Sequence, residues 1–291
     1  MNDVVNKPTG AYRMDRDEYD RIPYLNCSKL KVALRSTQHF KAELNKDPAT
    51  PSTSKALAFG SAFHTYCLEP HLFDDECAVC PNVDRRTKAG KATWAGFLDA
   101  SSGKVVVQES ELEQMDRMID ALHDHTGAAS LLFGDGNDYE MTYISNPKEE
   151  MAESMTSESL KGRIDVVNKS GGMLIDLKTC QDASPDAVSR TVLTYGYHIQ
   201  AAFYSHLHRQ VYGENPTFHF VFVEKEAPHG ILVATLDDDW LEYGAAECQR
   251  GIQAVTAWRL FGATNYNDGK AVTLAAPSFI KNRIGVTHAS N

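Results

Sequence analysis

Residues 159–179 read SLKGRIDVVNKSGGMLIDLKT, in which two short runs of β-forming residues flank a polar, glycine-containing segment. Apolar and polar residues alternate in both runs, as they do in half-buried strands. The sequence Asn-Lys-Ser-Gly-Gly at 168–172 is typical of a tight turn. The stretch therefore predicts a β-hairpin with strands at 159–167 and 173–179.

The second strand of this hairpin carries Asp176 and Lys178, an acidic and a basic residue two positions apart. Because side chains alternate along a strand, both point to one face, roughly 7 Å apart along the chain. In the first strand we expect Asp165 on the polar face, opposite Ile164 and Val166. Hairpin pairing would then bring Asp165 beside Asp176, so that two carboxylates and an ammonium converge on one patch.

This patch predicts a metal-dependent hydrolytic site. Neighbouring carboxylates repel each other unless a cation neutralises them. Oxygen ligands without soft donors favour Mg²⁺, with Mn²⁺ as a substitute, and the carbonyl of Leu177 would be another such ligand. A metal held there activates water and polarises a phosphodiester. Lys178 would orient the water or balance the charge on phosphorus.

Periodicity predicts further elements on both sides of the hairpin. Helices are expected at 28–45 (capped by Ser28), 54–69, 109–126, 186–193, 197–212 and from Asp237 to about Phe261; strands are expected at 138–145, 217–224 and 230–236. This order predicts an α/β (α+β) fold with a central mixed sheet flanked by helices. We expect one domain over 1–291: a helical N-terminal part to about 135 with a basic loop, a catalytic sheet core at 136–261 and an irregular tail at 262–291.

Composition is that of a globular protein, with 42% hydrophobic and 23% charged residues. The start of the chain lacks a secretion signal, and no apolar run reaches the roughly 18 residues of a membrane helix, so we expect a cytoplasmic protein. The net charge of −10 disfavours a protein that coats DNA. It disfavours a nuclease less, because binding depends on the local field in a cleft.

Cysteine usage offers no disulfide scaffold, because the six cysteines are few and scattered for a chain of this length. Cys77 and Cys80 have the spacing of half a zinc site, but no second half follows, so reduced buried thiols are expected. Only Cys180 and Cys248 lie beyond Lys178, too few for the cluster of an iron–sulfur nuclease. No Fe–S cluster is therefore expected.

Positive charge is concentrated in two places in the N-terminal half. The densest stretch lies in the polar segment 81–104, and its residues are candidates for DNA contact as well as for an ordinary charged loop: Arg85, Arg86, Lys88, Lys91 and Trp94. The second is scattered over the first predicted helix, where we expect a solvated face: Lys29, Lys31, Arg35 and Lys41.

The motifs around the hairpin form a recognisable series: His64, Glu140, Gly162-Arg-Ile-Asp165, Asp176-Leu-Lys178 and Gln200-Ala-Ala-Phe-Tyr204. As a set, over roughly residues 15–260, they resemble the RecB-type branch of the PD-(D/E)xK nuclease superfamily. Within that branch they resemble the nuclease domains of the RecE, or exonuclease VIII, type.

The resemblance implies a role for each matching residue. The metal would be held by four residues: Asp165, Asp176, His64 and, through its carbonyl, Leu177. Lys178 would be the catalytic lysine, and Glu140 the acidic residue on the strand before the hairpin. Gln200 and Tyr204, which share a helix face, would hold the active site and the DNA backbone.

The resemblance also implies an activity. The chain would be a Mg²⁺-dependent exodeoxyribonuclease that degrades linear double-stranded DNA, 5′→3′, in recombination by strand annealing. A ring-shaped homo-oligomer, possibly a tetramer, a RecT-type annealing partner and a bacterial or phage origin are implied as well. Two alternatives stay open: a structure-specific endonuclease with the same chemistry, and a non-catalytic DNA-binding subunit. The second is disfavoured because both acids and the lysine are present.

Overall fold

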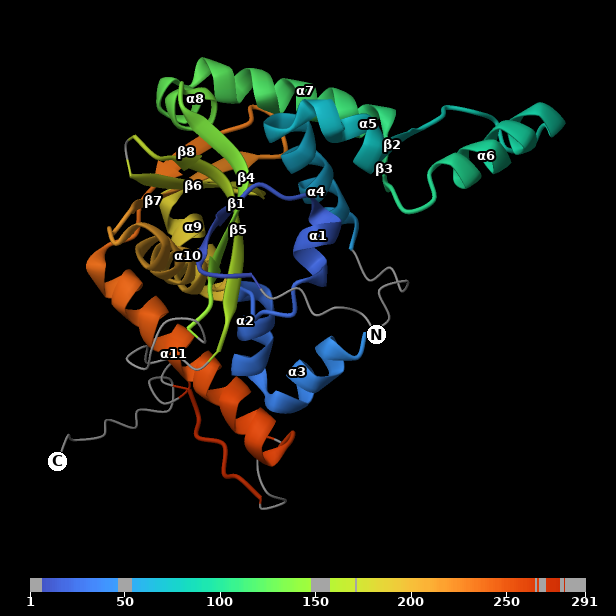
Figure 1. The fold of residues 1–291 in the computed structure, drawn as a ribbon. Helices are drawn as coiled ribbons and strands as arrows, with labels where there is room; N and C mark the ends of the chain where they lie inside the picture. The colour runs from blue at the N-terminus through green and yellow to red at the C-terminus, as the bar shows by residue number, and fades with distance from the viewer. Residues whose placement is uncertain are drawn as a thin grey trace.

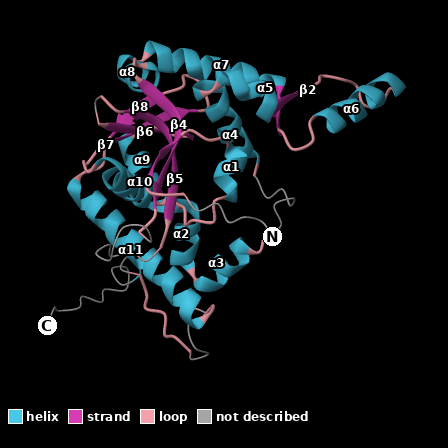
Figure 2. Cartoon of the chain, viewed as in Figure 1, coloured by secondary structure: helices cyan, strands magenta, loops and turns pink. Residues whose placement is uncertain are grey.

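The computed structural model describes residues 7–46, 54–147, 158–170, 172–264 and 271–277, together with residues 266 and 280. A sheet lies at the centre, with helices packed on both of its faces (Figure 2). The fold class expected from the sequence, a mixed sheet flanked by helices, is confirmed. In the described ranges no helix combines the length and apolar character needed to cross a bilayer.

The central sheet has six strands in the order β1-β4-β5-β6-β7-β8. Their bounds are Gly10–Tyr12, Asn137–Ser145, Leu160–Asn168, Met173–Cys180, Thr217–Glu224 and Ile231–Ala234, respectively. Only the pair β6 and β7 is parallel; the other neighbours are antiparallel. The hairpin β5–β6 thus occupies the middle of the sheet, and its chemistry-bearing residues lie deep in the molecule.

Two apolar layers cover the sheet. On one face, Leu174 and Phe220 pack with the helices α2 (Cys27–Arg35), α9 (Pro185–Tyr195), α10 (Tyr197–Tyr212) and α11 (Asp238–Phe261). On the other, Ile175 and Leu177 pack with α4 (Lys55–Leu68), α7 (Glu109–Asp124) and α8 (Thr126–Phe133). Strand β6 therefore alternates between the two layers as predicted, which sends Asp176 and Lys178 toward α10.

The N-terminal part differs from the expected helical part in several elements. Strand β1 joins the central sheet beside β4, and the short helices α1 (Arg16–Arg21) and α5 (Phe73–Glu76) and the 3-10 turn η1 (Pro70–Leu72) were not predicted. The helix expected over 28–45 is two helices, α2 and α3 (Thr37–Leu44). Ser36 separates them because its backbone is extended and its side chain accepts from the N–H of His39. The cap of α2 is Asn26, not Ser28.

The alternation predicted for β5 is wrong at one point. Ile164 lies in the α10 layer, whereas Val166 lies in the α4 layer. Between them Asp165 has no ladder partner, and neither has Glu140 on β4, whose φ of +51° is in the left-handed region. At this position the side chains of both strands change the face of the sheet to which they point, so Asp165 points toward α4.

The basic segment 81–104 is an arm rather than a loop. Strands β2 (Cys77–Cys80) and β3 (Val105–Gln108) pair in parallel at its base, and α6 (Lys88–Ala100) projects from the body of the molecule (Figure 1). Thr87 caps α6 by accepting from the N–H of Gly90. Cys77 and Cys80 are buried free thiols in β2; Cys27 and Cys67 are also buried and free, whereas Cys180 and Cys248 are free and half-buried. Residues 262–264 and 271–277 are in neither helix nor strand, and residues 281–291 of the expected tail lie outside the described chain.

Gly162 on β5 is required by the close approach of α10. A Cβ at this position would lie 2.7 Å from Cδ1 of Leu207 and 2.9 Å from Cε1 of Tyr204. We expect Gly162→Ala to lower the free energy of unfolding by about 1–3 kcal/mol, because the sheet and helix must move apart. Urea unfolding would measure it. Gly96→Ala on α6 is the control: nothing lies within 4 Å there, so the change should stabilise the helix slightly. Equal effects of the two changes would contradict the interpretation.

Candidate active site

The site lies where β5 and β6 separate. The ladder between these strands includes Val166 with Ile175 but not the next pair, Asp165 and Asp176. Instead, the carboxylate of Asp165 accepts a hydrogen bond from the N–H of Leu177 over 2.9 Å. The carboxylate of Asp165 thus takes the place of a backbone acceptor for the N–H of Leu177, and the two strands lie apart at the centre of the sheet. The register puts the two acids at neighbouring positions of the two strands, but they turn to different faces of the sheet rather than to the single face that was expected.

Strand β6 presents Asp176 and Lys178 to the α10 side of this opening. Asp176 is fully buried, and its two oxygens have different partners. The ammonium of Lys178 forms an ion pair with Oδ1, and the side-chain amide of Gln200 on α10 donates to Oδ2. A buried carboxylate with both oxygens engaged has a fixed orientation. Gln200 therefore holds the carboxylate of Asp176 from α10.

His64 reaches the site from α4. Its Nε2 lies 2.5 Å from the carbonyl oxygen of Leu177, and its Nδ1 lies 3.5 Å from Oδ2 of Asp165. Because a carbonyl can only accept, Nε2 carries the proton in this arrangement. One imidazole therefore contacts two oxygen atoms, both of which were expected to ligate a metal.

Glu140 completes a cluster on the same side. The guanidinium of Arg163 holds its carboxylate through Nε and also lies 3.6 Å from Oε2 of Glu69. One ligand atom from each of His64, Glu140 and Asp165 lies within 4.8 Å of the other two. Carboxylates and an imidazole at this spacing suit a small divalent cation. The residues present therefore fit a metal.

The cluster differs in one member from the metal ligands predicted from the sequence. Asp176 is not part of the compact group, because its oxygens face Lys178 and Gln200. Glu140, expected only as the acidic residue of the preceding strand, belongs to it. The left-handed backbone at Glu140 is the kind of local strain that collects at functional sites.

Burial and neighbouring charges shift the titration of the central groups. Burial, and then the charge of Asp176, raise the pKa of Asp165 to about 7. Burial alone would lower the pKa of the Lys178 ammonium. The negative charges of Asp176 and Asp165 outweigh burial and raise that pKa. Without a cation, the site therefore favours a protonated Asp165 beside an ionised lysine.

Tyr204 lies one helical turn beyond Gln200. Its ring approaches the backbone of β5 at Gly162, three residues before Asp165. Burial raises its pKa well above the usual value for a tyrosine, so the hydroxyl stays protonated. The structure thus places Tyr204 beside the site, where it can donate a hydrogen bond.

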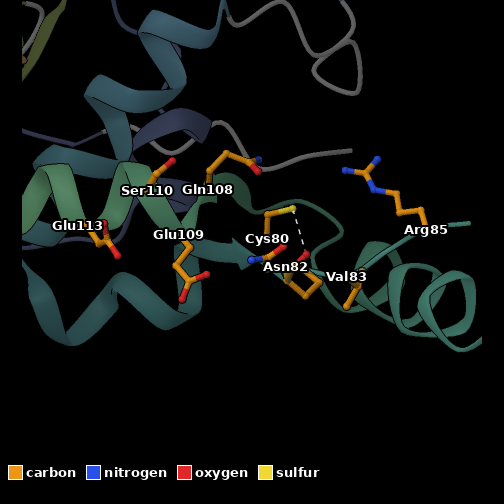
Figure 3. Close-up of a pocket in the computed structure, with 9 residues that line it drawn as sticks. Cys80, Asn82, Val83, Arg85, Gln108, Glu109, Ser110 and Glu113 are labelled. Atoms are coloured by element: carbon orange, nitrogen blue, oxygen red, sulfur yellow. Dashed lines mark hydrogen bonds between the residues drawn. The ribbon is translucent and has the colours of Figure 1, made fainter. Parts of the chain in front are cut away.

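The five candidate DNA-binding residues lie on the arm and not in this site. The guanidinium of Arg85 stacks on the ring of Trp94, 3.6 Å from its centroid, and Arg86 forms an ion pair with Asp84. At the base of the arm is an open hollow lined by residues that include Cys80, Arg85 and Glu109 (Figure 3). Figure 3 shows Arg85 set apart from Glu109, which lies on the α7 side.

Two contributors were missed by sequence reasoning. Arg163 lies within the Gly162-to-Asp165 motif, which could have drawn attention to it. Its ion pair with Glu140 could not be predicted, because it depends on the distortion of the two strands. Lys31 was expected on a solvated face. Instead its ammonium donates to the carbonyl of Tyr195 over 3.0 Å, on the Lys178 side of the site.

Comparisons with known proteins agree with the fold. Residues 26–260 match the family described as "PDDEXK-like domain of unknown function (DUF3799)". A solved structure named "Putative exonuclease", from Eubacterium rectale, is 14% identical, with a TM-score of 0.58 over 94% of this chain and 98% of that one. Another, SSO0001, is 12% identical over 83% and 88% with a TM-score of 0.28, which supports no conclusion. No curated protein matches the chain.

The raised pKa of Asp165 predicts how metal binding depends on pH. An unfolded aspartate titrates near pH 4, so the stability that a protonated Asp165 contributes is present below that pH. It is lost as the pH rises to about 7. A divalent cation binds the ionised form, so the gain in melting temperature on adding Mg²⁺ or Mn²⁺ should grow from pH 5 to pH 8.

Thermal unfolding in EDTA and in each metal, at four pH values, would test this expectation. Asp165→Asn should remove most of the metal-dependent gain and its pH dependence. A gain that is the same at pH 5 and pH 8 would show that Asp165 does not exchange its proton for the metal.

Proposed function

The chain belongs to the DUF3799 family of PDDEXK-like domains, and from that membership and the geometry of the site we propose that it is a divalent-metal-dependent deoxyribonuclease. The observation that carries the proposal is the opening between β5 and β6. There Asp165 on β5 lies next to Asp176 and Lys178 on β6, with Asp165 turned toward α4, where it contacts His64, and the other two turned toward α10.

The metal would be Mg²⁺, with Mn²⁺ as a substitute. Asp165, His64 and Glu140 would hold it, as their clustered ligand atoms support, and the carbonyl of Leu177, which contacts His64, would be a further ligand. Asp176 would join them when its pairing with Lys178 loosens. When bound, the cation would supply an activated water and polarise the phosphodiester.

The chain's own residues have separate tasks. Lys178, charged under all ordinary conditions, would position the attacking water and stabilise the negative charge that develops on the phosphate. Gln200 holds Asp176 in place during the reaction. Tyr204 would donate to a phosphate oxygen of the DNA backbone. Lys178 would thus serve the nucleophile, and Tyr204 the substrate.

Exonucleolytic cleavage of linear double-stranded DNA is the activity we favour. It is supported by the similarity to the "Putative exonuclease" over nearly the whole of both chains. RecE-type 5′→3′ polarity, a ring-shaped homo-oligomer, a RecT-type annealing partner and a role in recombination rest on the sequence resemblance. A structure-specific endonuclease would use the same residues, because the walls around a nuclease site decide exo- or endonucleolytic cleavage.

The arm would contact the DNA duplex away from the reacting phosphate. It gathers four positive residues in a protein with a net charge of −10: Arg85, Arg86, Lys88 and Lys91. The stacked pair of Arg85 and Trp94 gives it a flat aromatic surface as well. Phosphate contacts of this kind raise affinity without reading sequence.

The first test is cleavage of a linear duplex labelled at either the 5′ or the 3′ end. We expect Asp176→Ala to abolish metal-dependent cleavage and Lys178→Ala to lower kcat by about 10²–10³-fold, the cost of losing one preorganised charge. Lys169→Ala, in the turn of the same hairpin, is the control and should cleave normally. Cleavage of a covalently closed circle would show an endonuclease. A wild-type protein inactive in both metals would contradict the proposal.

The arm can be tested by binding alone. Replacing Arg85, Lys88 and Lys91 by Ala should weaken duplex binding and flatten the dependence of log K on log salt by about three units, one for each lost contact. Fluorescence anisotropy with a labelled duplex would measure both. Ala at Lys41, Lys46 and Lys169 removes the same charge elsewhere and should change the slope much less. Equal slopes for the two triple variants would exclude the arm as a DNA contact.

A further inference from the structure

A second cation lies beside the proposed catalytic lysine. Lys31 leaves α2 and runs along the turn between α9 and α10, where its Cε would lie 3.4 Å from a Cβ at Gly196. Its ammonium donates to the carbonyl of Tyr195. Gly196 forms this turn, because its φ of +64° is a conformation that glycine adopts readily and that ends α9.

Lys31 and Lys178 share an aromatic neighbour. The ammonium of Lys178 is 5.2 Å from the centroid of the Tyr197 ring, and that of Lys31 is 5.8 Å from it. Strand β6 and helix α2 therefore bring two positive charges to one ring at the edge of the site. Helix α10 begins at Tyr197, so the positive end of its dipole adds to the same field.

The partners of the two ammoniums are different. Lys178 is paired with Asp176, whereas no ion pair within 4.0 Å joins Lys31 to a carboxylate in the described chain. Burial, with the charge of Lys178 acting in the same direction, lowers the pKa of Lys31. Two cations held together in a half-buried place repel each other, and an anion bound between them would relieve that repulsion.

The same turn carries an exposed aromatic ring. Tyr195 has 62% of its surface exposed, although its ring centroid lies only 5.9 Å from that of Tyr197. Leu193, 55% exposed, extends the apolar surface. The exposed ring and the ammonium, which has no ion pair in the described chain, both neighbour the Tyr197 ring. Together they suit a nucleotide, which offers both a base and a phosphate.

We propose that Lys31 and Tyr195 bind the nucleotide next to the scissile phosphate: the ammonium takes its phosphate, and the ring stacks on its base. This inference rests on the proposed nuclease function and names a substrate-positioning subsite for it. Because stacking requires an unpaired base, the subsite favours a frayed or single-stranded end over an intact duplex. Lys31 would act on substrate binding and leave the metal cluster untouched.

Binding without turnover tests the subsite. A fluorescein-labelled 12-nucleotide single strand would be titrated with protein in Ca²⁺, from 50 to 200 mM NaCl, and checked afterwards for integrity. Lys31→Met keeps the stem and removes the charge. We expect it to weaken binding about three- to tenfold and to reduce the salt slope by about 0.7, the value for one phosphate of a single strand.

Several comparisons separate this role from a structural one. Lys31→Arg should retain binding, and Lys41→Met on α3 is the charge-matched control. Tyr195→Ala should weaken single-strand binding about fivefold or more without changing the salt slope, whereas Tyr266→Ala, another exposed tyrosine, should not. In turnover, Lys31→Met should raise KM and leave kcat nearly unchanged.

The outcomes distinguish the two proposals. An active enzyme whose Lys31→Met variant keeps its affinity and salt slope, or loses only melting temperature, would overturn the subsite and leave the nuclease function intact. A wild-type protein that neither cleaves nor binds the oligonucleotide would overturn both.

Discussion

The hydrogen bond from the N–H of Leu177 to the carboxylate of Asp165 is the constraint on which the rest of the site depends. It takes the place of a ladder bond at the centre of the sheet, where an unpaired backbone donor would be costly. The strands β5 and β6 can therefore separate without losing a partner, and the carbonyl of Leu177 is left to His64. One interaction thus both stabilises the opening and fixes the acid that lines it.

An opening lined by buried acids needs compensating charge, and the chain supplies it from opposite sides. Lys178 pairs with Asp176 on the α10 side, and Arg163 pairs with Glu140 on the α4 side. Asp165 stands between them and is the acid whose pKa is raised to about 7. Asp165 also belongs to the cluster that fits a divalent cation, so the proposed metal would neutralise the acid whose ionisation the fold disfavours most.

Much of this arrangement could be predicted from local sequence. Strand β6 keeps its alternation, so the common face of Asp176 and Lys178 follows from parity alone. The face of Asp165 could not be predicted, because it depends on one left-handed backbone angle at Glu140, on another strand. The position of Lys31 could not be predicted for a similar reason. Helical periodicity places it among charged neighbours, and only the packing of α2 against the α9–α10 turn shows that its ammonium donates to the carbonyl of Tyr195.

The net charge of −10 need not oppose a DNA substrate when the positive groups are gathered as they are here. Lys31, Lys178 and the start of α10 lie together at the edge of the catalytic opening, and the arm carries a second group on α6. Local potential governs where a phosphate backbone settles, whereas the acidic remainder repels it. Repulsion over most of the surface limits nonspecific coating, so substrate would be retained mainly where the chain can act on it. An acidic chain whose positive groups gather at the edge of the acid-lined opening and on the arm is therefore consistent with binding that is local and with release after cleavage.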